Sequence, residues 1–541
     1  MQIKSYFLEK YTNLIGQIQK RLADKDRQWF IVSVFILNTV YPVQLMFQLY
    51  RNIGDRLSNS FCELWFSGVF AVLIAVIFHK YLLYAFSFIS VILFAVDLFC
   101  YFRYNTVFDE SLSDLLYNTN YGEAYEYLRQ EADTGYLFYF IFFIVIGFLL
   151  LRFIKIFLLR VNFSMKKYII LFFLLLIFIF ISNFSSIVKT DNISEKVVFR
   201  INSITYYCML FRNHFQNTVY DEINAYLDEW SEDNKDLYFS EDGNDGEPEY
   251  VIYCIGESYS SHFASAYGYS LKTTPYLDDC NNKVVFRHAV SPESYTVGAL
   301  KRIGMNSVKN GSDKFYENGA IADIMKNAGW DTCWISNQNY GGNMGGIEKM
   351  LAERCDKSIF SFRGEYWQAN IPHDEVLLPF IKDEALAGNK KMIFIHLMGS
   401  HFLPYERYPD NFNFFRPSDI EADSDRKREF IAQYCNSVLY NDYVMKRIAD
   451  IFRAKNAVMV YLSDHGEIVF NGRDANRVGR GYEDIDPVVY DVPMIVWVSD
   501  VCKEKYADRI KELDQIKDDV FYTENVSDVI FKLAGIKIRE D

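Results

Sequence analysis

Five long apolar runs, nearly free of charged side chains, fill much of the first 190 residues and constrain the fold more than any other feature. They lie at residues 29–50, 64–78, 81–102, 136–159 and 168–188. A helix needs about 20 apolar residues to cross a bilayer core, and the second, third and fourth runs reach this length only with their flanks. The alternative is a set of buried core helices in a soluble protein. Because the five runs lie so close together, we predict five transmembrane helices.

The charges of the connecting segments predict how these helices are oriented. Basic residues dominate before the first run, between the second and third, and between the fourth and fifth, whereas the segment 103–135 carries seven acidic residues and two arginines. Lys and Arg concentrate in cytoplasmic loops. We therefore predict a multi-pass protein of an inner membrane with a cytoplasmic N-terminus. An odd number of helices then places the C-terminal half on the outer side of the membrane.

The composition narrows the class of protein further. A formal charge of −14 offers no basic surface for a phosphate backbone, which argues against nucleic acid as a partner. With 50% hydrophobic and 23% charged residues, the sequence is not that of a disordered chain. The nine cysteines include no C-x-x-C pair and allow no assignment of disulfides. Cys254 lies inside an apolar run and is predicted to be a buried thiol.

A polar hinge separates the apolar runs from the soluble half. Residues 197–230 have a helical apolar stripe, which either lies on the membrane surface or packs on the chain's own soluble domain. Residues 231–249 are acidic and polar and are predicted to be a linker. The chain therefore divides into a domain of five transmembrane helices at 1–190, a juxtamembrane helix and acidic linker at 191–249, and a soluble domain at 250–541.

Short apolar runs and helical stretches alternate in the soluble half. The predicted strands lie at residues 250–255, 283–286, 331–335, 391–397, 457–462 and 492–498. The predicted helices lie near 297–308, 319–329, 372–386, 428–454 and 525–534. This alternation is typical of an α/β sandwich around a mostly parallel sheet. Functional residues in such sheets gather at the carboxyl ends of the strands.

Three of the predicted strands end in residues with metal-binding side chains. Glu257 follows the first strand and His401 follows the fourth. Asp464 and His465 follow the fifth. Carboxylate and imidazole groups delivered from separate strands suit a zinc-type divalent ion, and a site that keeps an open position is catalytic. Each short motif alone is more often an ordinary loop, but the three together predict a metal centre.

A hydroxyl nucleophile could lie at the start of the helix predicted at 297–308. Ser291, Ser294 and Thr296 precede this helix. Free N–H groups and the helix dipole favour an anionic oxygen or a phosphate there, and a bound metal ion would activate the hydroxyl. Thr296 could instead be a plain N-cap. The residues alone do not choose among the three hydroxyls.

The motifs of the soluble half resemble those of the phosphoethanolamine transferases of Gram-negative envelopes, which belong to the alkaline phosphatase and sulfatase superfamily. The matching segments are Gly-Glu-Ser at 256–258, residues 267–277, 334–338, 396–401 and 438–442, and Ser-Asp-His-Gly-Glu at 463–467. The layout of five spans followed by a periplasmic domain is also similar to that family. Several segments are most similar to the branch that modifies the core heptose of lipopolysaccharide.

The resemblance implies a zinc-dependent transferase whose C-terminal sulfatase-like α/β domain lies in the periplasm. It selects Thr296 as the nucleophile, which would form a covalent phosphoethanolamine intermediate. It also implies metal ligation by Glu257, Thr296, Asp464 and His465, with one or two Zn²⁺ ions in preference to Mn²⁺. By the same resemblance His401 is a catalytic acid or base.

Four further residues are expected to contact substrate. Family members usually carry another histidine after the Asp-His motif, but no histidine follows His465 in this sequence, so Arg480 is expected to hold the phosphate instead. Asn337 and His396 lie in the matching segments, and a structural role is the alternative for His396. Asn105 lies in the outer loop after the third run, which either takes the lipid donor or is a solvated loop.

The implied function is transfer of phosphoethanolamine from phosphatidylethanolamine to lipid A, core heptose or another envelope glycan at the bacterial inner membrane. A phosphoglycerol transferase of the lipoteichoic-acid-synthase kind is the first alternative, since it shares the fold and the threonine nucleophile. A phosphatase or sulfatase on the same fold is the second, and a catalytically inactive sensor or scaffold is the third. The membrane anchor fits a lipid donor, because the reacting bond lies at the headgroup level.

Overall fold

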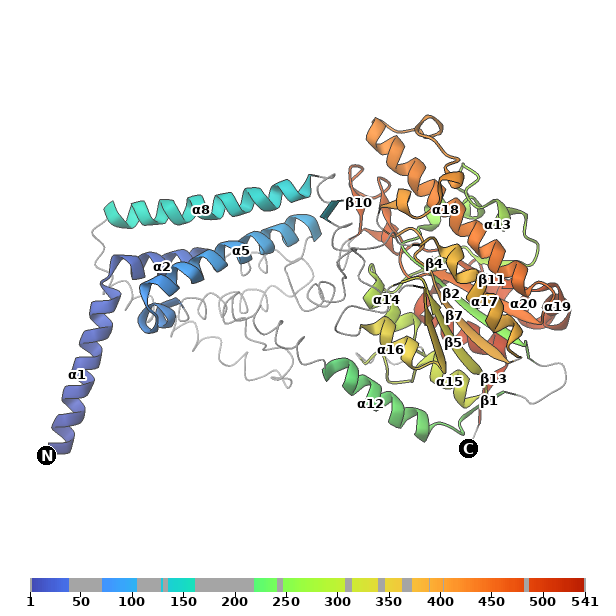
Figure 1. Cartoon of the computed structure of the whole chain (residues 1–541), viewed down its shortest axis with the longest axis horizontal. Helices are drawn as coiled ribbons and strands as arrows, with labels where there is room; N and C mark the ends of the chain where they lie inside the picture. Colours follow the sequence, from blue (N-terminus) through green and yellow to red (C-terminus); the bar gives the residue numbers. More distant parts are fainter. Residues whose placement is uncertain are drawn as a thin grey trace. The chain divides into compact units, whose positions relative to one another are not determined.

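The computed structural model divides the chain into two compact units (Figure 1). The first unit comprises Met1–Ser113 and Glu131–Phe215, and the second comprises Asp114–Gln130 and Gln216–Asp541. The structure describes residues 2–37, 71–104, 128–129, 135–160, 218–240, 247–306, 314–338, 346–361, 372–388, 390–401, 403–480 and 486–539.

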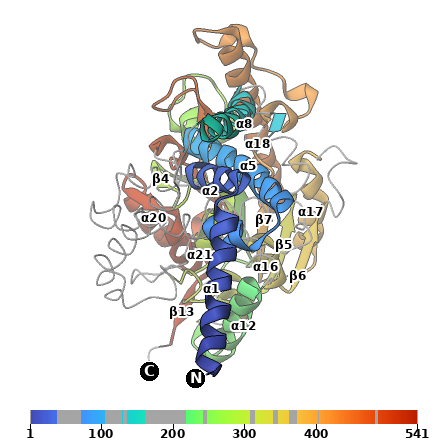
Figure 2. The ribbon, with the colours of Figure 1, turned by 90° about the vertical axis from the view of Figure 1, so that its left-hand side faces the viewer.

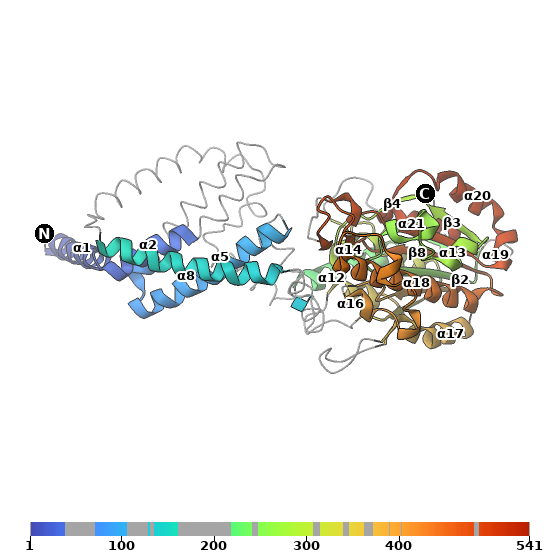
Figure 3. The same ribbon diagram turned by 90° about the horizontal axis from the view of Figure 1, so that it is seen from above.

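The described part of the first unit consists of helices. They are α1 (Gln2–Leu22), α2 (Lys25–Leu37), α5 (Lys80–Tyr104) and α8 (Tyr136–Arg160). α2, α5 and α8 lie side by side (Figure 2, Figure 3). The buried side chains between them include Phe30 and Ile154. Gly147 of α8 faces α5, and a β-carbon there would come within 2.8 Å of Val91 Cγ1. The glycine therefore lets these two helices approach closely.

Among the described residues, two helices are long and apolar enough to cross a membrane, over Lys80–Phe102 and Leu137–Arg160. They correspond to the third and fourth predicted spans. α2 covers the beginning of the first predicted span, and the end of the second is helical at residues 71–77. The fifth, at 168–188, lies outside the described residues, as do residues 38–50 of the first and 64–70 of the second. The count of five transmembrane helices therefore remains a prediction, as does their orientation.

A seven-stranded sheet forms the centre of the second unit. Its strands are β2 (Tyr250–Gly256), β3 (Lys283–Phe286), β5 (Asp331–Ser336), β6 (Lys357–Phe360), β7 (Lys391–His396), β8 (Ala457–Ser463) and β11 (Met494–Val498). Their order is β3-β11-β8-β2-β7-β5-β6. The strands from β8 to β6 are parallel to one another, and β11 is antiparallel to both β8 and β3. The structure thus confirms the predicted mostly parallel sheet.

Helices cover both faces of this sheet (Figure 1), so β2, β7, β8 and β11 are buried along their whole length. The helices of the unit are α12 (Thr218–Asp233), α13 (Pro275–Asp279), α14 (Thr296–Ile303), α15 (Ile321–Asn327), α16 (Ile347–Glu353), α17 (Leu378–Leu386), α18 (Asp425–Phe452), α19 (Asp500–Lys505), α20 (Ala507–Ile516) and α21 (Val526–Ala534). On one face Tyr250 packs on Phe452 of α18. On the other face Tyr253 donates a hydrogen bond to the carbonyl of Ile303 in α14.

Shorter elements complete the unit. Among the described residues, three strand pairs lie outside the main sheet: β1 (Tyr238–Ser240) with β13 (Ile536–Ile538), β4 (His288–Val290) with β12 (Val520–Tyr522), and β9 (Ile468–Val469) with β10 (Val478–Gly479). The 3₁₀ helices are η1 (Ser261–Phe263), η2 (Ser265–Tyr267), η4 (Asp374–Leu377), η5 (Pro404–Glu406), η6 (Asp410–Phe412), η7 (Pro417–Asp419), η8 (Pro487–Val489) and η9 (Thr523–Asn525).

The predicted elements agree closely with the observed sheet. Each of the six predicted strands is present, with bounds within two residues of those predicted. The strand β6 was missed because it is a four-residue edge strand with an exposed Lys357. The helix predicted at 297–308 ends at Ile303, where the chain turns so that Met305 pairs with Ala320.

The described part of the juxtamembrane segment packs on the soluble unit. Arg354, which follows α16, donates hydrogen bonds to Asn224 and Asp228 of α12. Trp230 of α12 lies against Gly319, where a β-carbon would overlap its ring. α12 is thus packed on the chain's own domain, whereas the residues of the apolar stripe, at 197–211, lie outside the described residues, so both interpretations of the stripe remain open.

The segment predicted as an acidic linker contains a strand. β1 pairs with β13 in an antiparallel register that joins Tyr238 to Ile538 and Ser240 to Ile536. Tyr238 and Ser240 are buried in this pair, which explains why an otherwise polar segment is ordered there. Residues 197–217 and 241–246 lie outside the described residues.

Replacing Arg354 by Leu should lower the free energy of unfolding by about 2–3 kcal/mol, because Asp323 would stay fully buried without its guanidinium partner. Lys326, 3.3 Å from Asp323, limits the loss. Denaturant unfolding of the purified chain measures the effect. Arg426, which is exposed on α18, is the control, and Arg426→Leu should change the free energy of unfolding by less than about 0.5 kcal/mol. Equal effects of the two variants would contradict a buried ion pair.

Candidate metal centre

The three predicted strand ends lie side by side at one edge of the sheet. β2 is paired on one side with β8 and on the other with β7, and all three run in the same direction. The side chains that follow them therefore emerge together. Gly256 pairs with Ser463 in the register, so Glu257 and Asp464 leave the sheet at the same level.

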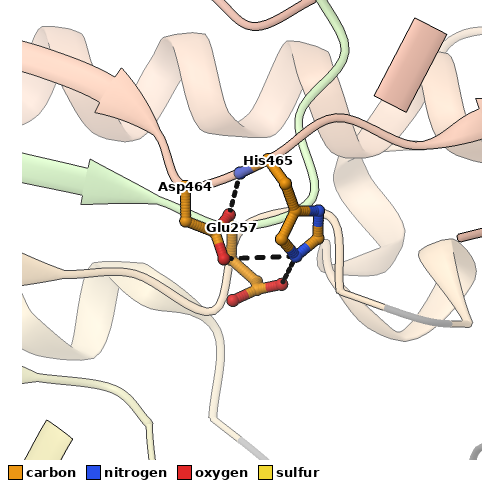
Figure 4. A group of neighbouring side chains, drawn as sticks. All are labelled: Glu257, Asp464 and His465. Atoms are coloured by element: carbon orange, nitrogen blue, oxygen red, sulfur yellow. Dashed lines mark hydrogen bonds and ion pairs between the residues drawn. The ribbon is translucent and has the colours of Figure 1, made fainter. Parts of the chain in front are cut away.

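Glu257, Asp464 and His465 form a buried triad (Figure 4). Their ligand atoms lie within 4.8 Å of one another, and all three residues are fully buried. The Nε2 atom of His465 is 3.2 Å from Glu257 Oε1 and 3.2 Å from Asp464 Oδ2. Two carboxylates therefore face one imidazole nitrogen.

The protonation of His465 makes this arrangement suitable for a cation. Its Nδ1 lies 2.8 Å from the carbonyl oxygen of Gly466, which can only accept, so Nδ1 carries the proton. Burial and the charge of Arg480 lower the pKa of His465. The Nε2 atom is therefore unprotonated and presents a lone pair. Asp464 Oδ2 accepts no hydrogen bond although it is buried. A lone pair and two carboxylates directed at one point, with an orphaned oxygen among them, fit a divalent metal ion.

The two carboxylates of the triad have opposite pKa shifts. Burial and repulsion from Glu257 raise the pKa of Asp464 well above its ordinary value. Burial acts in the same direction on Glu257, but its contact with His465 and the positive charge of Arg480 outweigh burial and hold the pKa of Glu257 well below its ordinary value. A bound cation would offset both the burial and the repulsion and so lower the pKa of Asp464.

Thr296 is the hydroxyl that faces the triad. It is the first residue of α14, and its Oγ1 lies 3.1 Å from Glu257 Oε2 and 3.3 Å from His465 Nε2. The N-cap of α14 is Tyr295, so Thr296 is not the plain N-cap that was the alternative. Ser291 instead donates hydrogen bonds to the carbonyls of Glu293 and Asp464. Of these two hydroxyls, that of Thr296 faces the triad, and its role as nucleophile remains a prediction.

The loop after β7 packs tightly on the backbone of Glu257. Gly399 has a φ of 54°, and a β-carbon there would lie 2.6 Å from the carbonyl oxygen of Glu257. Asp374 accepts hydrogen bonds from the backbone N–H groups of Met398 and Gly399 at 2.8 and 3.0 Å. These contacts hold the backbone that leads to His401, whose N–H donates to the carbonyl of Met398.

His401 is neutral at physiological pH. Its side chain is buried, and burial, supported by the charges of Arg480 and Arg407 and opposed by Glu257, lowers its pKa to about 3. A neutral imidazole can accept a proton, whereas an imidazolium cannot.

Arg480 reaches the same site from the chain after β10. Its Nη1 donates to Ser258 Oγ at 2.9 Å and to Glu467 Oε2 at 3.3 Å, and its Nη2 lies 3.4 Å from Glu257 Oε1. The guanidinium thus contacts the carboxylate of Glu257, which is a metal ligand according to the family resemblance.

The other residues predicted to contact substrate have different surroundings. Asn337 is buried, and its side chain is bonded to Asp374, to the carbonyl of Pro372 and to Ser361, so it supports the scaffold of the site, and its predicted contact with substrate remains a prediction. His396 is buried and lies 2.9 Å from Glu348, which agrees with the structural alternative. Asn105 lies outside the described residues.

Sequence reasoning missed two residues that organise the site. Asp374 holds the loop after β7, as described above. Tyr434 of α18 donates a hydrogen bond to the carbonyl of Ser258 and accepts one from the N–H of Ser260. Both lie in helical stretches that the sequence predicted, but nothing in their spacing distinguished them from ordinary helical positions.

The described cysteines take no part in this chemistry. All seven of them are free thiols, and Cys254 is fully buried, as predicted. Burial raises the pKa of the Cys254 thiol well above its ordinary value, so it is not a thiolate.

A match to a family model decides the classification. The Sulfatase model matches residues 249–535, more than half of the chain. The chain belongs to the sulfatase family. This match covers the whole main sheet and all four residues of the candidate centre.

Relatives within this family confirm the resemblance seen in the sequence. Phosphoethanolamine transferase EptC of Escherichia coli K12 is 26% identical over 491 residues, which cover 87% of this chain and 83% of that protein. Phosphoethanolamine transferase EptA of Helicobacter pylori is 31% identical over 272 residues, which cover 48% of this chain and 49% of that protein.

Two solved structures of sulfatase-family transferases are similar in fold. The crystal structure of the C-terminal periplasmic domain of E. coli EptC in complex with Zn is 27% identical, covers 56% of this chain and 85% of that one, and has a TM-score of 0.50. The integral membrane protein EptA of Neisseria meningitidis is 16% identical and covers 95% of this chain and 96% of that one, with a TM-score of 0.61. The latter shows that both units share the fold of a membrane-bound member.

Replacing Glu348 by Gln should destabilise the chain mainly at acidic pH. Burial opposes the charge on His396, but Glu348 outweighs it and raises the pKa of His396 above its ordinary value. The stabilisation by this pair is therefore complete below about pH 6.5 and is lost as the pH rises through the folded-state pKa. Thermal unfolding from pH 5 to 9 should show a difference from the native chain of about 1 kcal/mol at pH 5 that shrinks at higher pH. Glu353→Gln, on the exposed side of α16, is the control, and a pH-independent difference for Glu348→Gln would refute the ion pair.

Proposed function

We propose that this chain is a zinc-dependent, membrane-anchored phosphoethanolamine transferase. It would transfer phosphoethanolamine from phosphatidylethanolamine to lipid A, core heptose or another envelope glycan. The observation that carries the proposal is the position of Thr296, whose hydroxyl lies within 3.3 Å of two members of the buried triad. The similarity to phosphoethanolamine transferase EptC over 87% of the chain supports the transferred group, and the similarity to a Kdo(2)-lipid A phosphoethanolamine transferase of Escherichia coli K12 supports a lipid A acceptor.

The proposed location is the bacterial inner membrane, with the second unit in the periplasm. The helices α5 and α8 are long and apolar enough to act as an anchor, and the similar EptC domain is described as periplasmic. A membrane anchor suits a lipid donor, because the donor's phosphate lies at the membrane surface and cannot leave it readily. Asn105 remains a predicted contact of the donor in the outer loop.

Glu257, Asp464, His465 and Thr296 would hold the metal ion. One imidazole, two carboxylates and a hydroxyl oxygen suit zinc better than manganese, because imidazole is the softer ligand. When bound, zinc would act as a Lewis acid that lowers the pKa of the threonine hydroxyl and withdraws charge from the phosphoryl oxygens.

The first half-reaction forms the covalent intermediate on Thr296. The threonine oxygen bonds to phosphorus, and the bond between phosphorus and the diacylglycerol oxygen breaks. The threonine loses its proton, and diacylglycerol leaves after gaining one. The position of Thr296 at the start of α14 also directs free N–H groups at the phosphoryl group.

The second half-reaction regenerates the enzyme. An oxygen of the acceptor attacks phosphorus and the bond to Thr296 breaks, so the acceptor loses a proton and the threonine regains one. His401, neutral and fixed by the loop after β7, is the proposed acid or base for these protons. Arg480 is the proposed contact for a phosphoryl oxygen. Two separate half-reactions predict ping-pong kinetics.

Mass spectrometry of the peptide 288–301 tests donor, nucleophile and reaction class together. Chain purified from membranes that contain phosphatidylethanolamine should carry a phosphoethanolamine adduct on Thr296. The adduct should be absent from Thr296→Ala and retained in Ser294→Ala, which removes a hydroxyl from the same peptide. A glycerophosphate adduct would identify the phosphoglycerol transferase instead. An unmodified Thr296 in zinc-loaded chain that releases phosphoethanolamine to water would identify a hydrolase.

His401→Gln should slow transfer by about 10²–10⁴-fold, the usual contribution of acid–base catalysis, because the variant cannot accept a proton. Its zinc content should match that of the native chain, since His401 is not among the proposed ligands. Transfer to a lipopolysaccharide acceptor and metal analysis measure the two quantities. The control is His288→Gln, which changes an exposed histidine of β4 and should leave both unchanged. Loss of zinc from His401→Gln would show that His401 acts as a ligand.

A further inference from the structure

A second charged group lies beside the triad. The side chain of Arg480 is only 9% exposed and contacts the carboxylates of Glu257 and Glu467. Glu467 is itself buried. The oxygen Glu257 Oε1 thus contacts both groups. It lies 3.2 Å from Nε2 of His465, in the triad, and 3.4 Å from Arg480 Nη2.

We propose that Arg480 is a fixed cation that takes the place of a second metal ion, so that the centre binds one divalent ion per chain. The inference rests on the proposed function, because it concerns the metal centre of that reaction, and it settles the number of ions that the sequence left at one or two. Arg480 is a positioning residue in this account, since it acts on the carboxylates around the metal.

The charges of the centre balance with one divalent ion. Glu257, Asp464 and Glu467 supply three carboxylates, and Arg480 supplies one guanidinium that stays protonated in proteins. One divalent ion neutralises the remaining two negative charges. A second one would leave an excess of positive charge in a buried site, which is costly.

The guanidinium also contacts the carboxylates that a second ion would need as ligands. In two-metal centres the two ions lie about 3.5–4 Å apart and share ligands. Here the oxygen that faces His465, Glu257 Oε1, is also the one that contacts Arg480, and the guanidinium is bonded to Glu467 and Ser258 as well. The carboxylates that could hold a second ion are therefore already paired.

The backbone around Arg480 keeps it in place. Arg480 directly follows β10, whose Val478 and Gly479 pair with Val469 and Ile468 of β9. Val478 and both residues of β9 are buried, and Gly479 has a φ of 85°, which a side chain would disfavour. The arginine is thus placed by a paired, buried hairpin.

Arg480 orients a metal ligand as well. Its Nη1 donates to Ser258 Oγ, and Ser258 in turn donates to Glu257 Oε1 at 2.7 Å. Ser258 has a φ of 56°, an unusual value for a serine, and its N–H donates to Asp464 Oδ1 at 3.1 Å. One serine therefore connects the arginine to both carboxylates of the triad.

Zinc counting on the full-length chain in detergent tests the inference. Native chain, Arg480→Ala, Arg480→Lys and Arg473→Ala are stripped with a chelator, reloaded with excess zinc, desalted and analysed by mass spectrometry of the metal. Arg473 is exposed on the same loop and serves as the matched control. A His465→Ala sample measures the zinc that binds outside the triad. This amount is subtracted from the zinc content of each of the other samples.

We expect one zinc ion per chain for the native protein, for Arg473→Ala and for Arg480→Lys, which keeps the positive charge. Arg480→Ala should take up a second ion, because Glu257 and Glu467 lose their cation. Two ions on the native chain, or one ion on a folded Arg480→Ala, would overturn the inference.

A measurement on the native chain covers the case in which Arg480→Ala does not fold. X-ray absorption at the zinc edge should show no zinc–zinc distance near about 3.5–4 Å after loading with excess zinc. A zinc–zinc distance in that range would overturn the inference without any variant.

The outcome is separable from that of the proposed function. One zinc ion on a chain without a phosphoethanolamine adduct on Thr296 would leave the role of Arg480 intact and refute the transferase. Two zinc ions on a chain that carries the adduct would refute the role of Arg480 and leave the transferase intact. A native chain that binds no zinc would refute the metal centre itself, and the role of Arg480 with it.

Discussion

Two buried carboxylates that face one imidazole nitrogen determine how the rest of the soluble unit is built. Glu257 and Asp464 repel each other away from water, and this repulsion must be offset for both to be charged. The fold supplies part of the compensation through backbone N–H groups, which donate to Asp464 Oδ1 from Ser258 and His465. Arg480 supplies another part. What remains is a net negative charge that a divalent cation can neutralise, so the affinity for metal follows from the way the loops are folded.

The parallel sheet delivers these groups with little freedom. β8, β2 and β7 are fully buried and hydrogen-bonded on both sides, so the three loops that leave them start from fixed points. The loops then adopt backbone conformations that the rest of the structure must enforce, at Ser258 and Gly399. Asp374 and Tyr434 enforce them through hydrogen bonds to the backbone. These two side chains belong to the site although neither faces the metal position.

Much of this could be predicted from the sequence, and the exceptions have physical reasons. Buried strands are continuous apolar runs, so the six predicted strands were correct, whereas the half-exposed edge strand β6 has no such signal. The triad was predicted because its members directly follow strands. The choice of Thr296 over Ser291 depends on which way each side chain points, and that is fixed only when α14 packs on the sheet. Asn337 was expected to contact substrate because its motif resembles the family, but its amide is used within the scaffold.

The pairing of β1 with β13 ties together two segments that lie far apart in the chain. Tyr238–Ser240 precedes the main sheet, and Ile536–Ile538 follows it, yet the two segments are hydrogen-bonded to each other. The strands that carry Glu257 and Asp464 lie between them in the sequence, so the metal ligands belong to a stretch of chain whose two ends are held together. Separation of β1 from β13 would open this stretch at its ends before it disturbed the buried strands that position the ligands.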